Sequence, residues 1–206
     1  MSGAAAEAGA AGGGRDDDVL RAFVALEIGE DLRAALRDVQ RRLRKAEARV
    51  AWVAPGNVHL TLVFLGDVFR AQVRALAPRL DEAAAGVPAF AWRAGRPGSF
   101  GRPGAPRVLW VGVDPVPQAL LDLRRRVAEA VAACGLPVEA RPFAPHLTIG
   151  RVRGAQGADR LTALLASSTT VPAGAVEARR VRLMRSILNP GGAAYSVLHE
   201  SSLKGA

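Results

Sequence analysis

An internal repeat restricts the possible folds of this chain more than any other feature of its sequence. Phe23 precedes His59 by 36 positions, and Trp110 precedes His146 by the same 36. At this spacing "FVALE" aligns with "WVGVD", and "PGNVHLTLVF" aligns with "PFAPHLTIGR". Hydrophobic patterning predicts a strand, a helix and a second strand in each copy. We therefore expect an α+β, bilobal fold in which duplicated strand–helix–strand units carry antiparallel sheets that face each other across a central groove.

Periodicity and turn signals place the individual elements. We expect strands at 21–28, 59–66, 89–95, 107–114, 146–152, 177–188 and 194–203, and helices at 30–50, 70–85, 118–135 and 160–166. Pro78 should kink the second of these helices or cut it short. Gly135 should close the third. The Gly/Pro-rich stretch 96–106 predicts a loop at a lobe boundary or hinge, and "NPGG" predicts a hairpin turn between the last two strands.

Composition suggests one domain that follows a short tail. We interpret residues 1–18 as a disordered Ala/Gly-rich tail, because they lack the basic start and aliphatic centre of a signal peptide. Residues 19–206 should then form a single bilobal domain. The chain has no apolar run long enough to span a bilayer, and Cys134 is its only cysteine, so we expect a cytoplasmic protein with Cys134 in its core.

The net charge of +9 favours polyanionic partners such as RNA or phosphorylated metabolites. An Arg-rich composition produces the same charge without any such partner, and the cluster Arg41, Arg42, Arg44 and Lys45 is typical of a solvated helix face.

The repeated strand carries a histidine followed two places later by a threonine. Side chains alternate along a strand, so His59 and Thr61 share one face while Leu60 and Leu62 share the other. His146 and Thr148 repeat the arrangement. The chain has three His and five Thr among 206 residues, so two such pairs arise by chance with a probability of about 0.002.

Two imidazoles and two hydroxyls suit the hydrolysis of a strained cyclic phosphodiester. Attack on phosphorus requires a base for the incoming water and an acid for the leaving oxygen, and these groups act in line on opposite sides of the phosphate. Imidazoles titrate near neutral pH, and hydroxyls can donate hydrogen bonds to the phosphate oxygens. This chemistry needs no metal or other cofactor. The sequence also lacks His and Cys spacing typical of zinc ligands, and a phosphate-binding Gly loop followed by Lys.

The paired motif, with "WVAPGNVHLTLVFLGDV", "RPFAPHLTIGRV" and "MRSILNPGGAAYSVL" around it, resembles the two-histidine (2H) phosphoesterase superfamily. The resemblance is to its RNA 2′,3′-cyclic phosphodiesterase branch, the 2′-5′ RNA ligase-like proteins, and it covers roughly residues 21–203. It implies that the protein opens a 2′,3′-cyclic phosphate on RNA or a nucleotide to a 2′-phosphate, and we separately expect a monomer. His59 would be the general acid, His146 the general base, and Thr61 and Thr148 the phosphate ligands. The residues alone are compatible with either assignment of acid and base.

Phe64 and Arg151 each lie five positions past a motif histidine. By pseudo-symmetry they should flank the mouth of the groove, where a ring and a guanidinium can sandwich a nucleobase and the arginine can reach phosphate. For Phe64 a place in the core is the competing interpretation. We expect His199 on a surface strand, and Trp52, Trp92 and Trp110 in the core or groove wall. The joining of RNA ends through a 2′-5′ linkage, or RNA binding without catalysis, remain alternative functions.

Overall fold

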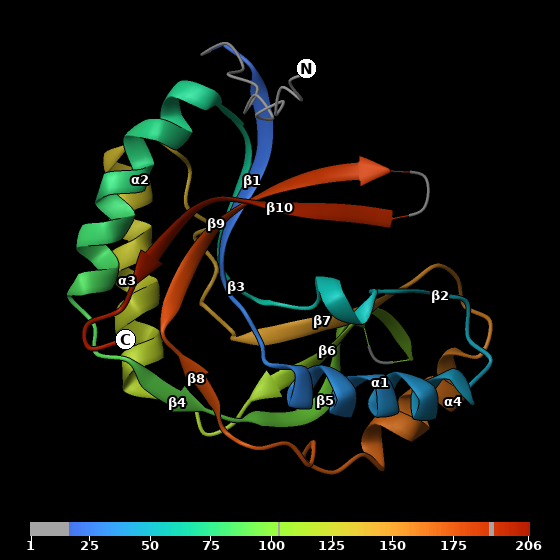
Figure 1. Ribbon diagram of the computed structural model, residues 1–206. Helices are drawn as coiled ribbons and strands as arrows, with labels where there is room; N and C mark the ends of the chain where they lie inside the picture. The colour runs from blue at the N-terminus through green and yellow to red at the C-terminus, as the bar shows by residue number, and fades with distance from the viewer. Residues whose placement is uncertain (1–16, 103, 190–191) are drawn as a thin grey trace, which may run out of the picture.

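The computed structural model describes residues 17–102, 104–189 and 192–206 (Figure 1). The elements in chain order are β1 Val19–Leu26, α1 Glu30–Arg44, β2 Val50–Trp52, the 3₁₀-helix η1 Pro55–Asn57, β3 Leu60–Phe69, α2 Arg70–Ala85, β4 Phe90–Trp92, β5 Ala94–Arg102, β6 Ala105–Val113, α3 Gln118–Ala133, β7 His146–Val152, α4 Ala158–Ala166, β8 Val176–Ala178, β9 Arg180–Asn189 and β10 Gly192–Ser202. Most of the predicted tail therefore lies outside the described residues.

One antiparallel sheet carries both copies of the repeat. Its strand order is β10-β9-β1-β3-β7-β6-β5, and β2 pairs with β7. The two central strands, β3 and β7, pair only at Leu60 and Leu147. The sheet therefore consists of two halves joined at a single point, with one motif strand on each side of the junction. This arrangement confirms the predicted α+β class with antiparallel sheets.

The helices interlock the two halves. α2 and α3 pack against each other, α3 also contacts β3, and α2 contacts β9 and β10 (Figure 1). α1 contacts α4, which in turn lies against β5 and β6. Each repeat thus packs its helix against the other half of the sheet. α1 follows β1 in the chain but packs on the side of β7, and α3 follows β6 but packs on the side of β3. The buried aliphatic side chains accordingly form one continuous core.

The Gly/Pro-rich stretch 96–106 was predicted to be a loop or hinge, and this prediction is wrong. Residues 96–102 form most of β5 and residues 105–106 begin β6, and the two strands pair with each other. A Cβ on Gly98 would lie 2.4 Å from the Trp110 ring, so glycine is needed where this ring crosses β5. Pro97 is tolerated because β5 is an edge strand.

Pro78 does not cut α2 short, because the helix continues to Ala85. Pro78 lies on the exposed side, whereas Leu76 and Leu80 are buried. Packing of this apolar face outweighs the local cost of the proline. The other helix signal is confirmed, since α3 ends at Ala133 and Gly135 follows in the left-handed region with φ +69°. Cys134 is only partly buried, packed against the edge of the core.

The last two long strands form the predicted hairpin, β9 with β10. Pro190 and Gly191 of its turn signal lie outside the described residues. Within the described residues, no helix is both long enough and apolar enough to cross a membrane.

Candidate active site

His59 lies directly before β3 and is oriented by a backbone contact. Its Nδ1 is 2.8 Å from the carbonyl oxygen of Asn57. A carbonyl can only accept, so Nδ1 must carry the proton and donate it. In the neutral ring this leaves Nε2 as the proton acceptor. The buried neighbour Leu60 fixes which face of the sheet the imidazole occupies.

His146 repeats this arrangement at the start of β7. Its Nδ1 is 2.7 Å from the carbonyl oxygen of Ala144, again two residues earlier. The same tautomer follows, with Nε2 left as the acceptor. The two motifs therefore share a hydrogen-bonding device as well as a sequence pattern.

The pairing of β3 with β7 brings the two motifs together. Leu60 is opposite Leu147, so the antiparallel register directs His59 toward Thr148, and Thr61 toward His146. All four polar side chains then lie on the face opposite the two buried leucines. In a regular ladder the two histidines would be diagonal neighbours, about 7–8 Å apart. Each imidazole is thus placed beside the threonine of the other repeat.

A β-bulge turns Phe64 toward the same face. Strict alternation from Thr61 would place Phe64 on the buried side of β3. However, the β1–β3 register shifts between Val24 and Ala25, where β1 advances one residue and β3 advances two. The extra residue on β3 places the Phe64 side chain on the same face as Thr61, because a bulge re-aims the side chains that follow it. Its side chain is 57% exposed, which excludes the core position.

A matching bulge turns Arg151 in the same way. Leu109 pairs with Gly150 and Trp110 with Thr148, so β7 gains one residue relative to β6. Ile149 and Gly150 are buried, and Arg151 is exposed. The bulge lies at the same distance from the histidine in both motif strands.

Two adjoining cavities occupy this face of the sheet. The first, of about 480 Å³, is lined by His59, Thr61, Thr148, Arg151 and Phe64 together with other groups. The second, of about 340 Å³, is lined by His146 and shares Thr61 and Phe64 with the first. We call the two together the groove. All six predicted site residues line it, although the two imidazoles border different parts of it.

The two imidazoles have different surroundings. Phe23 stacks on His59 with ring centroids 4.5 Å apart, and Tyr195 meets it edge-on at 5.2 Å. This burial lowers the pKa of His59, which the hydrogen bond to Asn57 only partly offsets by raising it. His146 instead has the edge of Phe100 at 4.9 Å.

Several groove residues had no clear signal in the sequence. Tyr195 comes from β10, and burial raises the pKa of its hydroxyl while the nearby Arg151 charge lowers it. Asn57 donates from Nδ2 to the carbonyl oxygen of Ala193, 2.6 Å away, and so attaches β10 to the histidine loop. Only Phe23 could have been inferred, because the repeat aligns it with Trp110.

The remaining candidates lie outside the groove or in its wall. His199 is bonded to Asp81 on α2, with 2.8 Å between Nε2 and Oδ1. Trp92 is buried, and Trp110 packs on Phe100 beside His146. Trp52 lies under the Arg44 guanidinium, 4.8 Å from its carbon. Across the described ranges, no three His, Cys, Asp or Glu side chains gather as a metal site would require.

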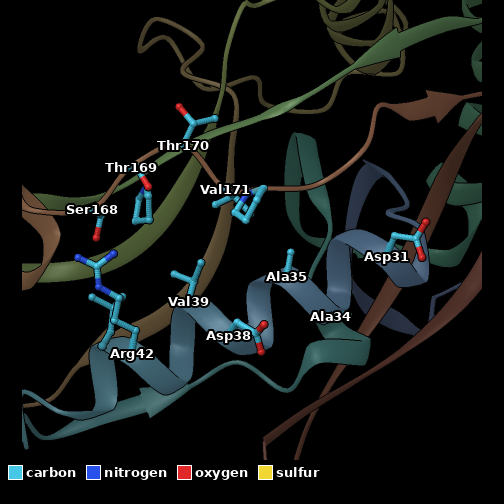
Figure 2. A pocket seen from close by; sticks show the side chains of 13 residues that line it. Asp31, Ala34, Ala35, Asp38, Val39, Arg42, Ser168, Thr169, Thr170 and Val171 are labelled. Carbon is cyan, nitrogen blue, oxygen red and sulfur yellow. The ribbon is translucent and has the colours of Figure 1, made fainter.

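A further cavity, of about 530 Å³, lies between α1 and residues 168–172 (Figure 2). It is bordered by Asp31, Asp38 and Arg42, and none of the predicted site residues lines it. Arg42 donates to the carbonyl oxygen of Ser167, and Asp38 is paired with Arg41. This cavity therefore contributes nothing to the chemistry of the two motifs.

A family model described as the 2′-5′ RNA ligase superfamily matches residues 28–189. The chain belongs to this superfamily. Among the relatives of this superfamily member is an RNA 2′,3′-cyclic phosphodiesterase of Methanothermobacter thermautotrophicus, 34% identical over 86% of this chain and 95% of that protein. Another, of the same description, comes from Thermotoga maritima and is 31% identical over 90% of this chain and 97% of that protein.

Solved structures agree with the ligase-superfamily fold. A protein of Thermus thermophilus is 27% identical and has a TM-score of 0.74, covering 90% of this chain and 99% of its own. Escherichia coli LigT complexed with 3′-AMP is 25% identical and has a TM-score of 0.73, with 90% and 99% covered.

Proposed function

We propose that this protein hydrolyses 2′,3′-cyclic phosphodiester ends of RNA to 2′-phosphates, using its two histidines and no metal. The observation that carries the proposal is the cross-strand register of β3 and β7, which directs both imidazoles and both threonine hydroxyls to one face of the sheet. Relatives described as RNA 2′,3′-cyclic phosphodiesterases over most of the chain support it. So does the binding of 3′-AMP by LigT.

The proposed reaction assigns one proton to each imidazole. Nε2 of His146 accepts a proton from water as the water oxygen forms a bond to phosphorus. The bond from phosphorus to O3′ breaks, and His59 in its protonated form gives a proton to O3′. The product is a 2′-phosphate and a free 3′-hydroxyl. The Nδ1 contacts to Asn57 and Ala144 keep each Nε2 available for its transfer.

Thr61 and Thr148 bind the non-bridging phosphate oxygens in this proposal. Negative charge builds on these oxygens in the transition state, so hydroxyl donors stabilise it more than the ground state. Phe64 and Arg151 bind the rest of the nucleotide. The exposed ring offers a stacking surface for a base, and the guanidinium offers charge to phosphate.

The direct test compares three alanine variants in buffer containing EDTA. His59→Ala and His146→Ala should each lower kcat on a cyclic-phosphate-ended RNA by about 10²–10⁴-fold, because each removes a positioned acid or base. His199→Ala is the matched control, since this imidazole bonds Asp81 away from the groove. Full activity in both motif variants would contradict the proposal. Salt-sensitive RNA binding without turnover in the unmodified protein would instead support a binding protein.

The superfamily description also favours a second candidate function, the joining of RNA ends through a 2′-5′ linkage. The same imidazoles serve this reverse reaction when an RNA hydroxyl replaces water. Hydrolysis and joining of one substrate, measured at equal enzyme concentration, distinguish the two. We expect hydrolysis to dominate because water is in large excess.

We further propose that the protein acts as a cytoplasmic monomer. One chain supplies both motifs and every group of the groove described above. Light scattering coupled to size-exclusion chromatography should therefore give the mass of one chain, 21.5 kDa. A stable dimer would contradict this part of the proposal.

A further inference from the structure

The 480 Å³ cavity extends well beyond the two motifs. From His59 it continues past the buried Phe23 along β1 and β9 to Arg21, Ser186 and Leu188. Thr61 pairs with Ala25 on β1, and Arg21 lies four residues earlier on the same strand. At about 3.3 Å per residue, Arg21 is about 13 Å along the strand from the level of Thr61. A single phosphate between the motifs leaves this end of the cavity empty.

The far end of the cavity is suited to a second anion. The Arg21 side chain is 58% exposed, and its ion pair with Asp67 has a separation of 4.0 Å. Such a long, exposed pair contributes little, so the guanidinium can turn to a ligand at small cost. Arg151 borders the same cavity from β7. Arg21 is thus anchored on β1, at a fixed distance along the strand from the two motifs.

Apolar side chains border the path between the two anion positions. Leu188 on β9 is 69% exposed and Phe64 is 57% exposed, and both line this cavity. Large apolar side chains left open beside arginines are typical of single-strand nucleic-acid grooves, where they pack on bases and sugars. A mononucleotide is too short to contact Leu188 and Arg21 while its phosphate occupies the motifs.

We propose that Arg21 forms a second phosphate subsite, so that the preferred substrate is an RNA strand of two or three nucleotides or longer. The inference rests on the proposed function, because the motifs must hold the terminal cyclic phosphate. Internal phosphodiesters on the 5′ side then run along β1 toward Arg21. Leu188 and Phe64 pack against the nucleosides between the two phosphates.

The test measures kcat/KM for a series of cyclic-phosphate-ended oligonucleotides of one to six nucleotides. In the unmodified protein, kcat/KM should rise up to about the trinucleotide and then become constant. Arg21→Ala should lower the ratio of trinucleotide to mononucleotide kcat/KM by about threefold to tenfold at low salt, the size of one lost solvent-exposed hydrogen bond. Asp67→Asn should raise this ratio, because it removes a negative charge beside the incoming phosphate.

Arg125→Ala is the matched control. The Arg125 side chain is also 58% exposed and also ion-paired, but it lies on α3, outside the groove. Its replacement by alanine therefore removes the same net charge without changing the cavity. It should keep the unmodified ratio. An Arg21→Ala ratio equal to that of Arg125→Ala, or a kcat/KM that does not depend on length, would overturn the subsite.

Binding of fluorescent 2′-phosphate-ended oligonucleotides separates this inference from the proposed function. Arg21→Ala should weaken trinucleotide binding and reduce the slope of log affinity against log salt by about 0.7, the value for one single-strand phosphate contact. This result supports the subsite even when no hydrolysis occurs, whereas an unchanged slope contradicts it. If the unmodified protein does not hydrolyse these substrates but its affinity for oligonucleotides still rises with their length, only the catalytic proposal is contradicted.

Discussion

The two halves of the groove use one backbone device in two different environments. Both histidines bond through Nδ1 to the carbonyl two residues earlier, and both motif strands carry a bulge before Phe64 or Arg151. Around His59, however, Phe23 and Tyr195 close over the ring. Around His146, the ring edge of Phe100 is the corresponding contact.

This difference shows how a duplicated motif can support two roles. Two imidazoles in identical settings would share the acid and base forms equally at a pH near their pKa, whereas different settings favour one distribution of the proton over the other. The repeat supplies matched geometry, and the residues that do not repeat supply the difference. Asn57 attaches its half to β10, whereas the equivalent Ala144 has no polar side chain.

The largest expected effect tests what the halves have in common. Thr61→Val and Thr148→Val each remove one hydroxyl while keeping the shape of the side chain. Because each lies beside the histidine of the other repeat, we expect both to lower kcat by about 10²–10³-fold with little change in stability. Steady-state kinetics of the two variants and of a Thr162→Val control, on α4, measure this. A loss confined to one threonine would show that only one half binds the phosphate.

Much of this shared geometry could be predicted from sequence. The repeat follows from the two aligned motifs, the facing of His59 and His146 follows from alternation along each strand, and Gly135 correctly marked the end of α3. These features depend on local sequence alone. Phe64 and Arg151 both line the larger cavity of the groove, although strict alternation would have buried Phe64.

The remaining features depend on contacts between distant segments. A bulge depends on the fit between two strands, so neither β3 nor β7 signals one by itself. The exchange of α1 and α3 between the halves leaves the amphipathic pattern of each helix unchanged. The stretch 96–106 was wrongly predicted as a loop because Gly98 leaves room for the Trp110 ring rather than forming a turn. Pro78 does not shorten α2, because the packing of the apolar face of α2 outweighs the local cost of the proline.

A second variant examines where the halves diverge in packing. The repeat aligns Gly150 with Val63, but β2 covers only the β7 side, with Trp52 paired to Gly150. A Cβ at Gly150 would lie 2.8 Å from Val50 Cγ1 and 3.2 Å from the Trp52 ring. Gly150→Val should therefore destabilise the fold by about 1–3 kcal/mol through overpacking. Gly154→Val, where a Cβ meets nothing within 4 Å, is the control in chemical denaturation. Equal midpoints would mean that β2 does not need the glycine.

The smallest effect concerns the electrostatic difference between the two halves. Burial under Phe23 and Tyr195 lowers the pKa of His59, so Phe23→Ala should raise this pKa toward its ordinary value of 6.5. Phe100→Ala, beside His146, should leave the pKa of His59 in place. Imidazole NMR titrations, assigned with His59→Asn, measure both. An unchanged pKa in Phe23→Ala would remove stacking as the source of the asymmetry.

The same shift makes folding depend on pH in a defined direction. The folded state keeps His59 neutral while the unfolded chain binds a proton as the pH falls below 6.5. The stability that the chain gains from keeping His59 neutral is therefore fully present above pH 6.5. It is lost as the pH falls toward the lower pKa of His59 in the folded state. Phe23→Ala should flatten this slope of unfolding free energy against pH. A bound phosphate should also raise the pKa of His59, because its negative charge favours the imidazolium that the proposed acid requires. The closed half of the groove would then acquire its catalytic proton together with its substrate.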